Sequence, residues 1–242
     1  MAEMFSADQL VAMLNDGQLE VEGIVPWGSN YTFLVHVCHE QGEFDAIYKP
    51  GRGERPLWDF AKGTLCLRER AAYLVSEALS WNLVPPTILR KGPHGRGSIQ
   101  QYVAHDPEEH YLTFQGRFID QLQRIALFDV IINNADRKSG HVLLGEDNHI
   151  WAIDHGVCFH TDYKLRTVIW EFAGETIPTG LVSDMVAFQQ QLENPDSEIY
   201  RKLCELLVVQ EIAAMTSRIK RLVNRNVFPH PGPGRHYPWP LV

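Results

Sequence analysis

The sequence predicts an α+β fold in two lobes, with a β-rich first part followed by a mainly helical second part. Two β-type runs, at 31–37 and 44–49, fall in the first part. Two longer stretches, at 117–132 and 198–226, carry apolar residues at helical spacing and fall in the second part. A chain of 242 residues is long enough for one large domain or for two small lobes around a shared cleft.

The change in character lies near residue 104 and sets the expected boundaries. We expect an N-lobe over 1–104, a C-lobe over 105–228 and a Pro/Gly-rich tail over 229–242. The polar run 106–109 indicates a linker between the lobes. Because the prolines of the tail cannot continue a helix, the tail is expected to wrap the surface or to fray.

Local signals define the elements of the first part. In chain order, the sequence predicts a helix over 6–15, strands over 31–37 and 44–49, a loop over 51–63, a helix over 64–79 and strands over 87–90 and 98–103. Ser6 and Thr64 are the expected N-caps of the two helices, because their hydroxyls can accept a hydrogen bond from a free N–H of the first turn.

The composition argues against several classes of protein. A net charge of −8 disfavours nonspecific binding to nucleic acid or to an anionic membrane surface. No apolar run approaches the roughly 20 residues of a membrane-spanning helix, so no stable membrane insertion is expected. The four cysteines form no CxxC pair, and the first residues, Met1–Met4, include an acid where a secretion signal is basic. We therefore expect reduced thiols and a cytoplasmic location.

Two acidic motifs carry the functional prediction. Asp136 lies in a polar run that closes an apolar helical stretch, and Asp154 begins an Asp-His-Gly turn after the strand-like run 150–153. Enzymes of the kinase type need one carboxylate near the attacking hydroxyl and a second on the metal that holds the nucleotide phosphates. Either aspartate alone is typical of an ordinary turn. Together, at this interval, they predict a catalytic Asp136 and a metal-binding Asp154.

The motif departs from the kinase pattern at His141. Kinase catalytic loops place an Asn five positions after the catalytic Asp, where it binds the second metal ion, and here that position is His141. Mg²⁺ prefers oxygen ligands, whereas imidazole suits softer ions such as Mn²⁺. With His141 as a predicted metal ligand, three outcomes stay open: the second metal is bound differently, Mn²⁺ is favoured, or transfer is weak.

Lys49 is the candidate phosphate-binding lysine. It ends the second predicted strand on an otherwise apolar run, where a lysine needs a partner. Kinases hold such a lysine with a helical glutamate, and Glu69 is the first candidate, with Glu77 second. The alternative is a strand-edge lysine paired with Glu43 or Asp45.

Two weaker signals concern the nucleotide. Residues before the first strand would fold over the phosphates through backbone N–H groups, although the full GxGxxG pattern is missing: Gly28, Ser29 and Asn30. A second group, before the expected linker, would form the hinge that hydrogen-bonds adenine: Gln101, Tyr102 and Val103. The hinge assignment depends on position alone.

These residues resemble the phosphatidylinositol 3-/4-kinase-like branch of the protein-kinase fold. The resemblance lies in Lys49, Glu69, the loop 134–138 and the turn 153–156. More narrowly, the chain is similar to an uncharacterised actinobacterial-type family labelled the SCO1664 family. The stretches shared with that family are 48–50, 54–60, 133–138 and 154–159.

The resemblance implies a two-lobed protein-kinase-like fold that holds ATP with Mg²⁺, or Mn²⁺, between a β-rich N-lobe and a mainly helical C-lobe. Lys49 would contact the phosphates, Glu69 would position Lys49, and Asp136 would orient or deprotonate the acceptor hydroxyl. Asp154 would bind the metal. The segment 161–176 would occupy the activation-loop position.

The expected function is ATP-dependent phosphotransfer to a hydroxyl of a protein or small molecule. A lipid acceptor is less expected, because 242 residues leave little room for a membrane-binding module. Two alternatives stay open: a pseudokinase that binds nucleotide or partners without catalysis, and transfer of AMP in place of phosphate. The sequence does not identify the acceptor, the oligomeric state or the regulation.

Overall fold

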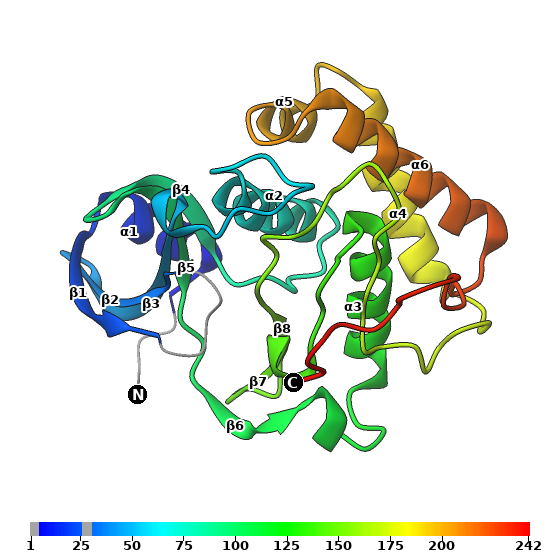
Figure 1. The fold of residues 1–242 in the computed structure, drawn as a ribbon, viewed down its shortest axis with the longest axis horizontal. Helices are drawn as coiled ribbons and strands as arrows, with labels where there is room; N and C mark the ends of the chain where they lie inside the picture. The colour runs from blue at the N-terminus through cyan, green and yellow to red at the C-terminus, as the bar shows by residue number, and fades with distance from the viewer. Residues whose placement is uncertain (1–4, 26–30) are drawn as a thin grey trace.

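The computed structural model describes residues 5–25 and 31–242, and these form a sheet-rich N-lobe and a mainly helical C-lobe (Figure 1). The predicted phosphate-covering residues Gly28, Ser29 and Asn30 lie outside the described residues. None of the helices in the described part of the chain has the length and apolar character needed to span a bilayer.

A five-stranded antiparallel sheet is the centre of the N-lobe. In chain order, the N-lobe elements are α1 (Ala7–Asp16), β1 (Gln18–Ile24), β2 (Phe33–His39), β3 (Gly42–Pro50), the 3₁₀ turn η1 (Gly51–Gly53), α2 (Leu65–Ala78), β4 (Thr87–Gly92) and β5 (Gly95–Gln101). The strand order is β1-β2-β3-β5-β4. The buried face of the sheet carries Val35, Val37, Ala46, Tyr48 and Ile99, which form a small core of their own.

Of the two predicted N-caps, Ser6 was correct and Thr64 was wrong. Ser6 caps α1 as predicted: its hydroxyl accepts a hydrogen bond from the Gln9 N–H, and the Gln9 side chain accepts one from the Ser6 N–H. Thr64 precedes α2, but the prediction of a side-chain cap was wrong, because its hydroxyl donates to the Ala61 carbonyl instead.

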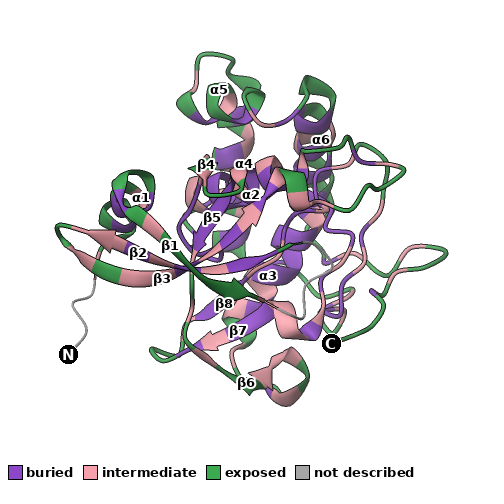
Figure 2. Cartoon of the chain, turned by 60° about the vertical axis from the view of Figure 1, so that its left-hand side comes forward, coloured by how far each residue is buried: buried purple, intermediate pink, exposed green. Residues whose placement is uncertain are grey.

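Strand β1 was not predicted. Its residues alternate apolar and acidic side chains, and almost all of them are exposed, as Figure 2 shows. An edge strand pairs on one side only and buries little, so its composition resembles that of a polar loop. Its pairing with β2 is irregular between Val21 and Gly23, which further weakens the local pattern.

The predicted linker over 106–109 was wrong. These residues belong to β6 (His105–His110), which pairs with β7 (Val142–Gly145) in the C-lobe, and the connection between the sheets is the shorter segment 102–104. Pro107 is tolerated because β6 lies at the edge of its sheet and its pairing register is irregular between His105 and His110.

The C-lobe combines a small sheet with helices. Its remaining elements are the 3₁₀ turns η2 (Tyr111–Thr113) and η3 (Ser139–His141), β8 (Ile150–Ala152), α3 (Ile119–Ile132), α4 (Thr179–Glu193), α5 (Glu198–Cys204) and α6 (Val209–Arg225). Helix α3 and the helical character of 198–226 were predicted. Helix α4 was missed, although Leu181, Met185, Phe188 and Leu192 give it a buried stripe at helical spacing.

Helix α2 joins the two lobes through its packing. Ala71, Ala72 and Val75 are fully buried and belong to the large C-lobe core together with Phe128 and Phe159. In Figure 1, α2 lies between the N-lobe sheet and the C-lobe helices. A side chain on α2 is therefore held against the C-lobe by a packed core rather than by a loop.

The tail over 229–242 wraps the C-lobe. The carbonyl of Leu241 accepts a hydrogen bond from the Ser139 N–H at 2.8 Å, and the carbonyl of His236 accepts one from the Thr167 N–H at 3.2 Å. The tail thus contacts the segment that contains Asp136 and His141.

Candidate active site

Three of the predicted site residues meet at one point. Lys49 Nζ donates hydrogen bonds to Glu69 Oε1 at 2.5 Å and to Asp154 Oδ1 at 2.9 Å. Lys49 is next to last in β3, Glu69 lies in the first half of α2, and Asp154 follows β8. The predicted Glu69 partner is confirmed, and Glu43 and Asp45 instead contact His36.

Opposite charges keep Lys49 and Asp154 ionised although both are partly buried. Burial disfavours the Lys49 ammonium, but Asp154 and Glu69 outweigh burial and raise the pKa of Lys49 above its ordinary value. Lys49 in turn holds the pKa of Asp154 far below its ordinary value. Burial raises the pKa of Glu69 against the opposing effect of Lys49. The site therefore presents an ammonium and an ionised carboxylate side by side.

Asp136 lies in the predicted catalytic loop, the catalytic-loop segment (133–141), which follows α3. Its N–H donates to Asn134 Oδ1 at 3.0 Å, and its carboxylate lies 3.5 Å from Lys138 Nζ. Burial raises the pKa of Asp136, and the neighbouring Lys138 only partly opposes this effect. A carboxylate with a raised pKa is a stronger proton acceptor than an ordinary surface aspartate.

His141 connects the two aspartates. Its Nδ1 lies 3.1 Å from the Asp136 carbonyl, and its Nε2 lies 3.3 Å from Asp154 Oδ2. Burial lowers the pKa of His141 to about 4, so the imidazole is neutral at physiological pH. When Nδ1–H donates to the carbonyl, the Nε2 lone pair faces the Asp154 carboxylate. Two electron-rich atoms in this position fit a divalent cation, and the imidazole favours Mn²⁺ over Mg²⁺.

A buried ion pair that the sequence did not reveal supports this site. Arg137 and Asp129 are both fully buried, and the guanidinium contacts the carboxylate at 3.0–3.1 Å. Arg137 also donates to the carbonyls of His141 at 3.1 Å and Ile153 at 2.7 Å, and it lies 2.7 Å from His155 Nε2. One side chain therefore links α3, the catalytic-loop segment and the residues around Asp154.

Helix α2 has its own ties to the Asp154 region. Glu69 Oε2 accepts a hydrogen bond from the His155 N–H at 2.8 Å. Arg68 donates to the Cys158 carbonyl at 2.7 Å and to Glu211 Oε1, in α6, at 2.6 Å. These contacts hold Glu69 near Asp154. The Lys49 ammonium donates a hydrogen bond to each of the two carboxylates.

The predicted hinge residues connect the two sheets. The Tyr102 N–H donates to the carbonyl of Asp45 in β3 at 2.9 Å, and the Val103 carbonyl contacts His105 Nδ1 at 2.7 Å. Gln101 is the last residue of β5. These contacts hold the segment beside β3, while its contact with adenine stays a prediction.

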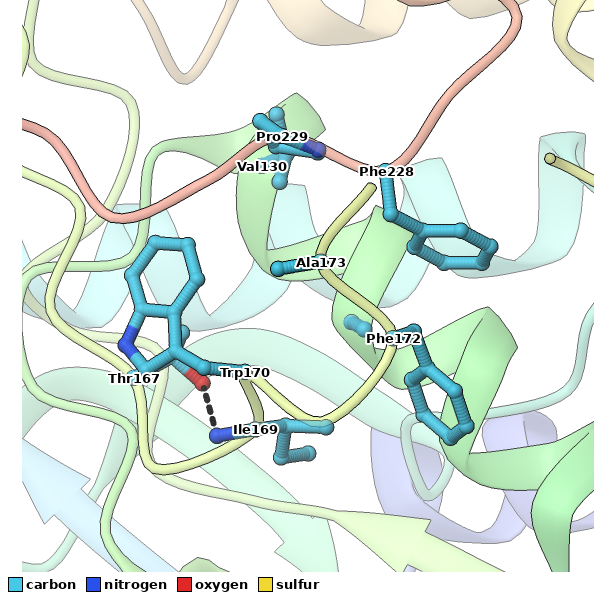
Figure 3. A pocket seen from close by; sticks show the side chains of 9 residues that line it. Val130, Thr167, Ile169, Trp170, Phe172, Ala173, Phe228 and Pro229 are labelled. Atoms are coloured by element: carbon cyan, nitrogen blue, oxygen red, sulfur yellow. Dashed lines mark hydrogen bonds between the residues drawn. The ribbon is translucent and has the colours of Figure 1, made fainter. Parts of the chain in front are cut away.

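A small apolar pocket in the C-lobe is separate from this cleft (Figure 3). It is lined by residues that include Val130, Trp170 and Phe228, and the Ile169 N–H donates to Thr167 Oγ1 at 3.2 Å on its wall. Its lining contains no charged side chain, so a phosphate group would find no ionic partner there.

The comparisons with known proteins agree with the geometry. The sequence profile described as phosphatidylinositol 3- and 4-kinase matches residues 65–223. The chain belongs to this family. The matched range contains Glu69, Asp136 and Asp154, and membership confirms the predicted two-lobed kinase-like fold class.

This chain is similar to proteins of related sequence and to a solved structure. Protein Rv2133c of Mycobacterium tuberculosis is 39% identical over 95% of this chain and 94% of its own length. Phosphatidylinositol 4-kinase gamma 4 of Oryza sativa subsp. japonica is 30% identical, and the match covers 45% of this chain and 22% of the plant protein. The crystal structure of a Helicobacter pylori proinflammatory kinase, CtkA, aligns with a TM-score of 0.49 at 9% identity, over 88% of this chain and 94% of that chain.

Proposed function

We propose that the protein transfers the γ-phosphate of ATP to a hydroxyl of a protein or small molecule. The observation that carries the proposal is the bridge that Lys49 of β3 forms between Glu69 of α2 and Asp154, in the turn after β8. Membership of the phosphatidylinositol 3- and 4-kinase family supports a kinase-type reaction. We also propose that the chain belongs to the SCO1664 family and that the protein is cytoplasmic.

Each site residue has a proposed role, and for the charged residues of the site this role follows from their contacts. Lys49 would neutralise charge on the nucleotide phosphates, and Glu69 would keep its ammonium in place. Asp154 and His141 would hold Mg²⁺ or Mn²⁺, which when bound neutralises charge on the phosphates. Asp136 would orient the acceptor hydroxyl and accept its proton, and its raised pKa suits that task. Gln101, Tyr102 and Val103 would contact adenine, and Gly28, Ser29 and Asn30 would cover the phosphates.

The first test is binding of ATP, because binding does not require the unknown acceptor. Calorimetric titrations with Mg²⁺ and then Mn²⁺ should show metal-dependent binding to the wild type, and Asp154→Ala should lose the metal dependence. Asp162→Ala is the matched control, since its side chain is 82% exposed, and it should bind like the wild type. No binding to the wild type with either metal would overturn the proposal.

Turnover separates phosphotransfer from the two alternatives. With γ-labelled ATP, label should reach an added hydroxyl acceptor, the protein itself or water, whereas α-labelled ATP should leave no label on protein or acceptor. Asp136→Asn should lower this turnover by at least 100-fold while ATP still binds. Protein-bound α-label would identify AMP transfer. ATP binding with no transfer of label to the protein, to water or to any added acceptor is the result that a pseudokinase predicts.

A further inference from the structure

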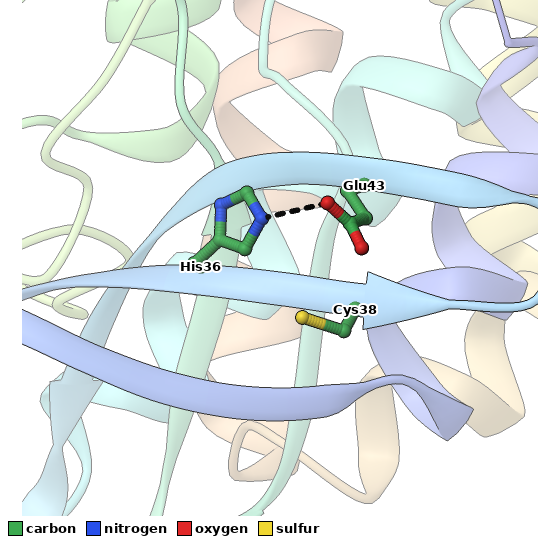
Figure 4. A group of neighbouring side chains, drawn as sticks. All are labelled: His36, Cys38 and Glu43. Carbon is green, nitrogen blue, oxygen red and sulfur yellow. Dashed lines mark hydrogen bonds and ion pairs between the residues drawn. The ribbon is translucent and has the colours of Figure 1, made fainter.

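The exposed face of the N-lobe sheet carries a group of metal-ligand side chains outside the kinase-like cleft. His36 and Cys38 project from β2, and Glu43 projects from β3 opposite Cys38 (Figure 4). Among the described residues, one ligand atom from each of these three side chains lies within 4.8 Å of the other two. Phe33, Val35 and Val37, which alternate with them along β2, are buried on the opposite face.

One of the ligand distances already matches a tetrahedral zinc site. Zn–S and Zn–N bonds of about 2.3 and 2.0 Å place neighbouring ligands roughly 3.3–3.6 Å apart. His36 Nε2 and Glu43 Oε2 are already 3.4 Å apart. The third ligand atom, the Cys38 sulfur, lies within 4.8 Å of one ligand atom on each of the other two side chains.

A fourth side chain orients the histidine. Asp45 Oδ1 lies 2.8 Å from His36 Nδ1, so the carboxylate can accept the Nδ1–H and leave Nε2 free as a ligand. This carboxylate–histidine arrangement is the usual support of zinc-binding histidines, because it fixes the tautomer and the ring direction.

The charge of the surrounding strands favours a cation. Glu20 pairs with His36 and His36 pairs with Asp45 across the three strands, while Glu43 lies beside this row. Carboxylates therefore flank His36 from both neighbouring strands, and a divalent cation would neutralise their negative charge. The thiolate and imidazole donors select zinc over Mg²⁺ or Ca²⁺, which prefer oxygen.

We propose that His36, Cys38 and Glu43 bind a zinc ion, with Asp45 positioning the histidine ring and water in the fourth position. Such an ion would cross-link β2 to β3, the strand that contains Lys49. The Asp45 carbonyl also accepts a hydrogen bond from the Tyr102 N–H. The proposed zinc site therefore adjoins the segment 102–104, which connects the two lobes. The proposal does not depend on phosphotransfer.

The test uses Co²⁺ as a spectroscopic substitute for zinc. The full-length, reduced and chelator-treated protein is titrated with Co²⁺ without nucleotide, and thiolate-to-cobalt absorption reports a cysteine ligand. One equivalent should give this absorption, and Zn²⁺ should abolish it. Cys38→Ser should lose the absorption, Glu43→Gln should keep it with weaker binding, and Asp45→Asn should weaken affinity by about 10–100-fold.

Two control variants identify the site. Cys204→Ser removes an exposed cysteine elsewhere, and Asp154→Ala removes the predicted cleft ligand; both should retain the absorption at the wild-type stoichiometry. No thiolate absorption in the wild type would overturn the proposal. So would absorption that persists in Cys38→Ser, or absorption that disappears in Cys204→Ser.

Discussion

Asp154 is the residue on which the cleft depends. One of its oxygens contacts Lys49, the other contacts His141, and its backbone has a φ of 62°. A non-glycine residue in this left-handed region persists only where its surroundings hold it. Arg137 and Glu69 supply that support through hydrogen bonds to the neighbouring residues Ile153 and His155. The strained turn directs the carboxylate toward Lys49.

His141 sets the expected metal preference. If its Nε2 is a ligand, phosphotransfer or ATP hydrolysis should be faster with Mn²⁺ than with Mg²⁺ at equal concentrations. His141→Asn replaces the ring nitrogen with an amide oxygen, so the ratio of the Mg²⁺ rate to the Mn²⁺ rate should rise by at least severalfold. Equal metal dependence in both proteins would show that His141 is no ligand. His149→Asn, in the hairpin between β7 and β8, where the ring contacts the Asn82 carbonyl and Trp151, is the control.

A second prediction at the scale of single residues concerns the contribution of the buried Asp129–Arg137 ion pair to stability. Asp129→Asn removes one charge of a fully buried pair and leaves the Arg137 guanidinium without its counter-ion. Breaking such a pair costs about 3–5 kcal/mol of unfolding free energy, which urea denaturation can measure. Asp120→Asn, at the exposed start of the same helix, should cost less than about 1 kcal/mol. Similar losses in the two variants would contradict the assigned role.

Among the elements, the sequence predicted those whose pattern is local. Strand β2 is rich in apolar β-branched residues, and α3 shows helical spacing, so both were found. Strands β1 and β6 were missed because they are exposed edge strands, whose pairing depends on partners elsewhere in the chain. Helix α4 did have a readable periodicity and was overlooked.

Arg68 of helix α2 forms an ion pair with Glu211 of helix α6, which is far away in the sequence. The stability of α2 should therefore depend on this pair. Arg68→Met leaves Glu211 buried without its partner and should cost about 3–5 kcal/mol of unfolding free energy. The double variant Arg68→Met/Glu211→Leu removes both charges and should recover a large part of that loss. A double variant as unstable as the sum of the two single variants would show that the pair does not act as a unit.

For the whole molecule, the sequence identified the charged residues of the cleft but not what holds them. Lys49, Glu69, Asp136 and Asp154 follow a motif spacing that can be compared with other sequences. Arg68 and Glu211 lie 143 positions apart and match no motif. In the sequence, Asp129 interrupts the apolar pattern of a helix. Only the three-dimensional structure shows that Asp129 pairs with Arg137. Supporting contacts of this kind depend on tertiary packing, which local patterns do not encode.

The tail connects the chain end to the catalytic-loop segment, so its removal should affect the site. Deleting 229–242 removes the carbonyls of Leu241 and His236, which accept the N–H groups of Ser139 and Thr167. Each hydrogen bond contributes about 0.5–1.5 kcal/mol, so the Tm should fall by at least a few degrees. Hydrogen exchange at these two amides should accelerate, whereas deletion of Val242 alone should leave both slow. Unchanged exchange in the longer deletion would show that the tail does not protect the segment that contains Asp136.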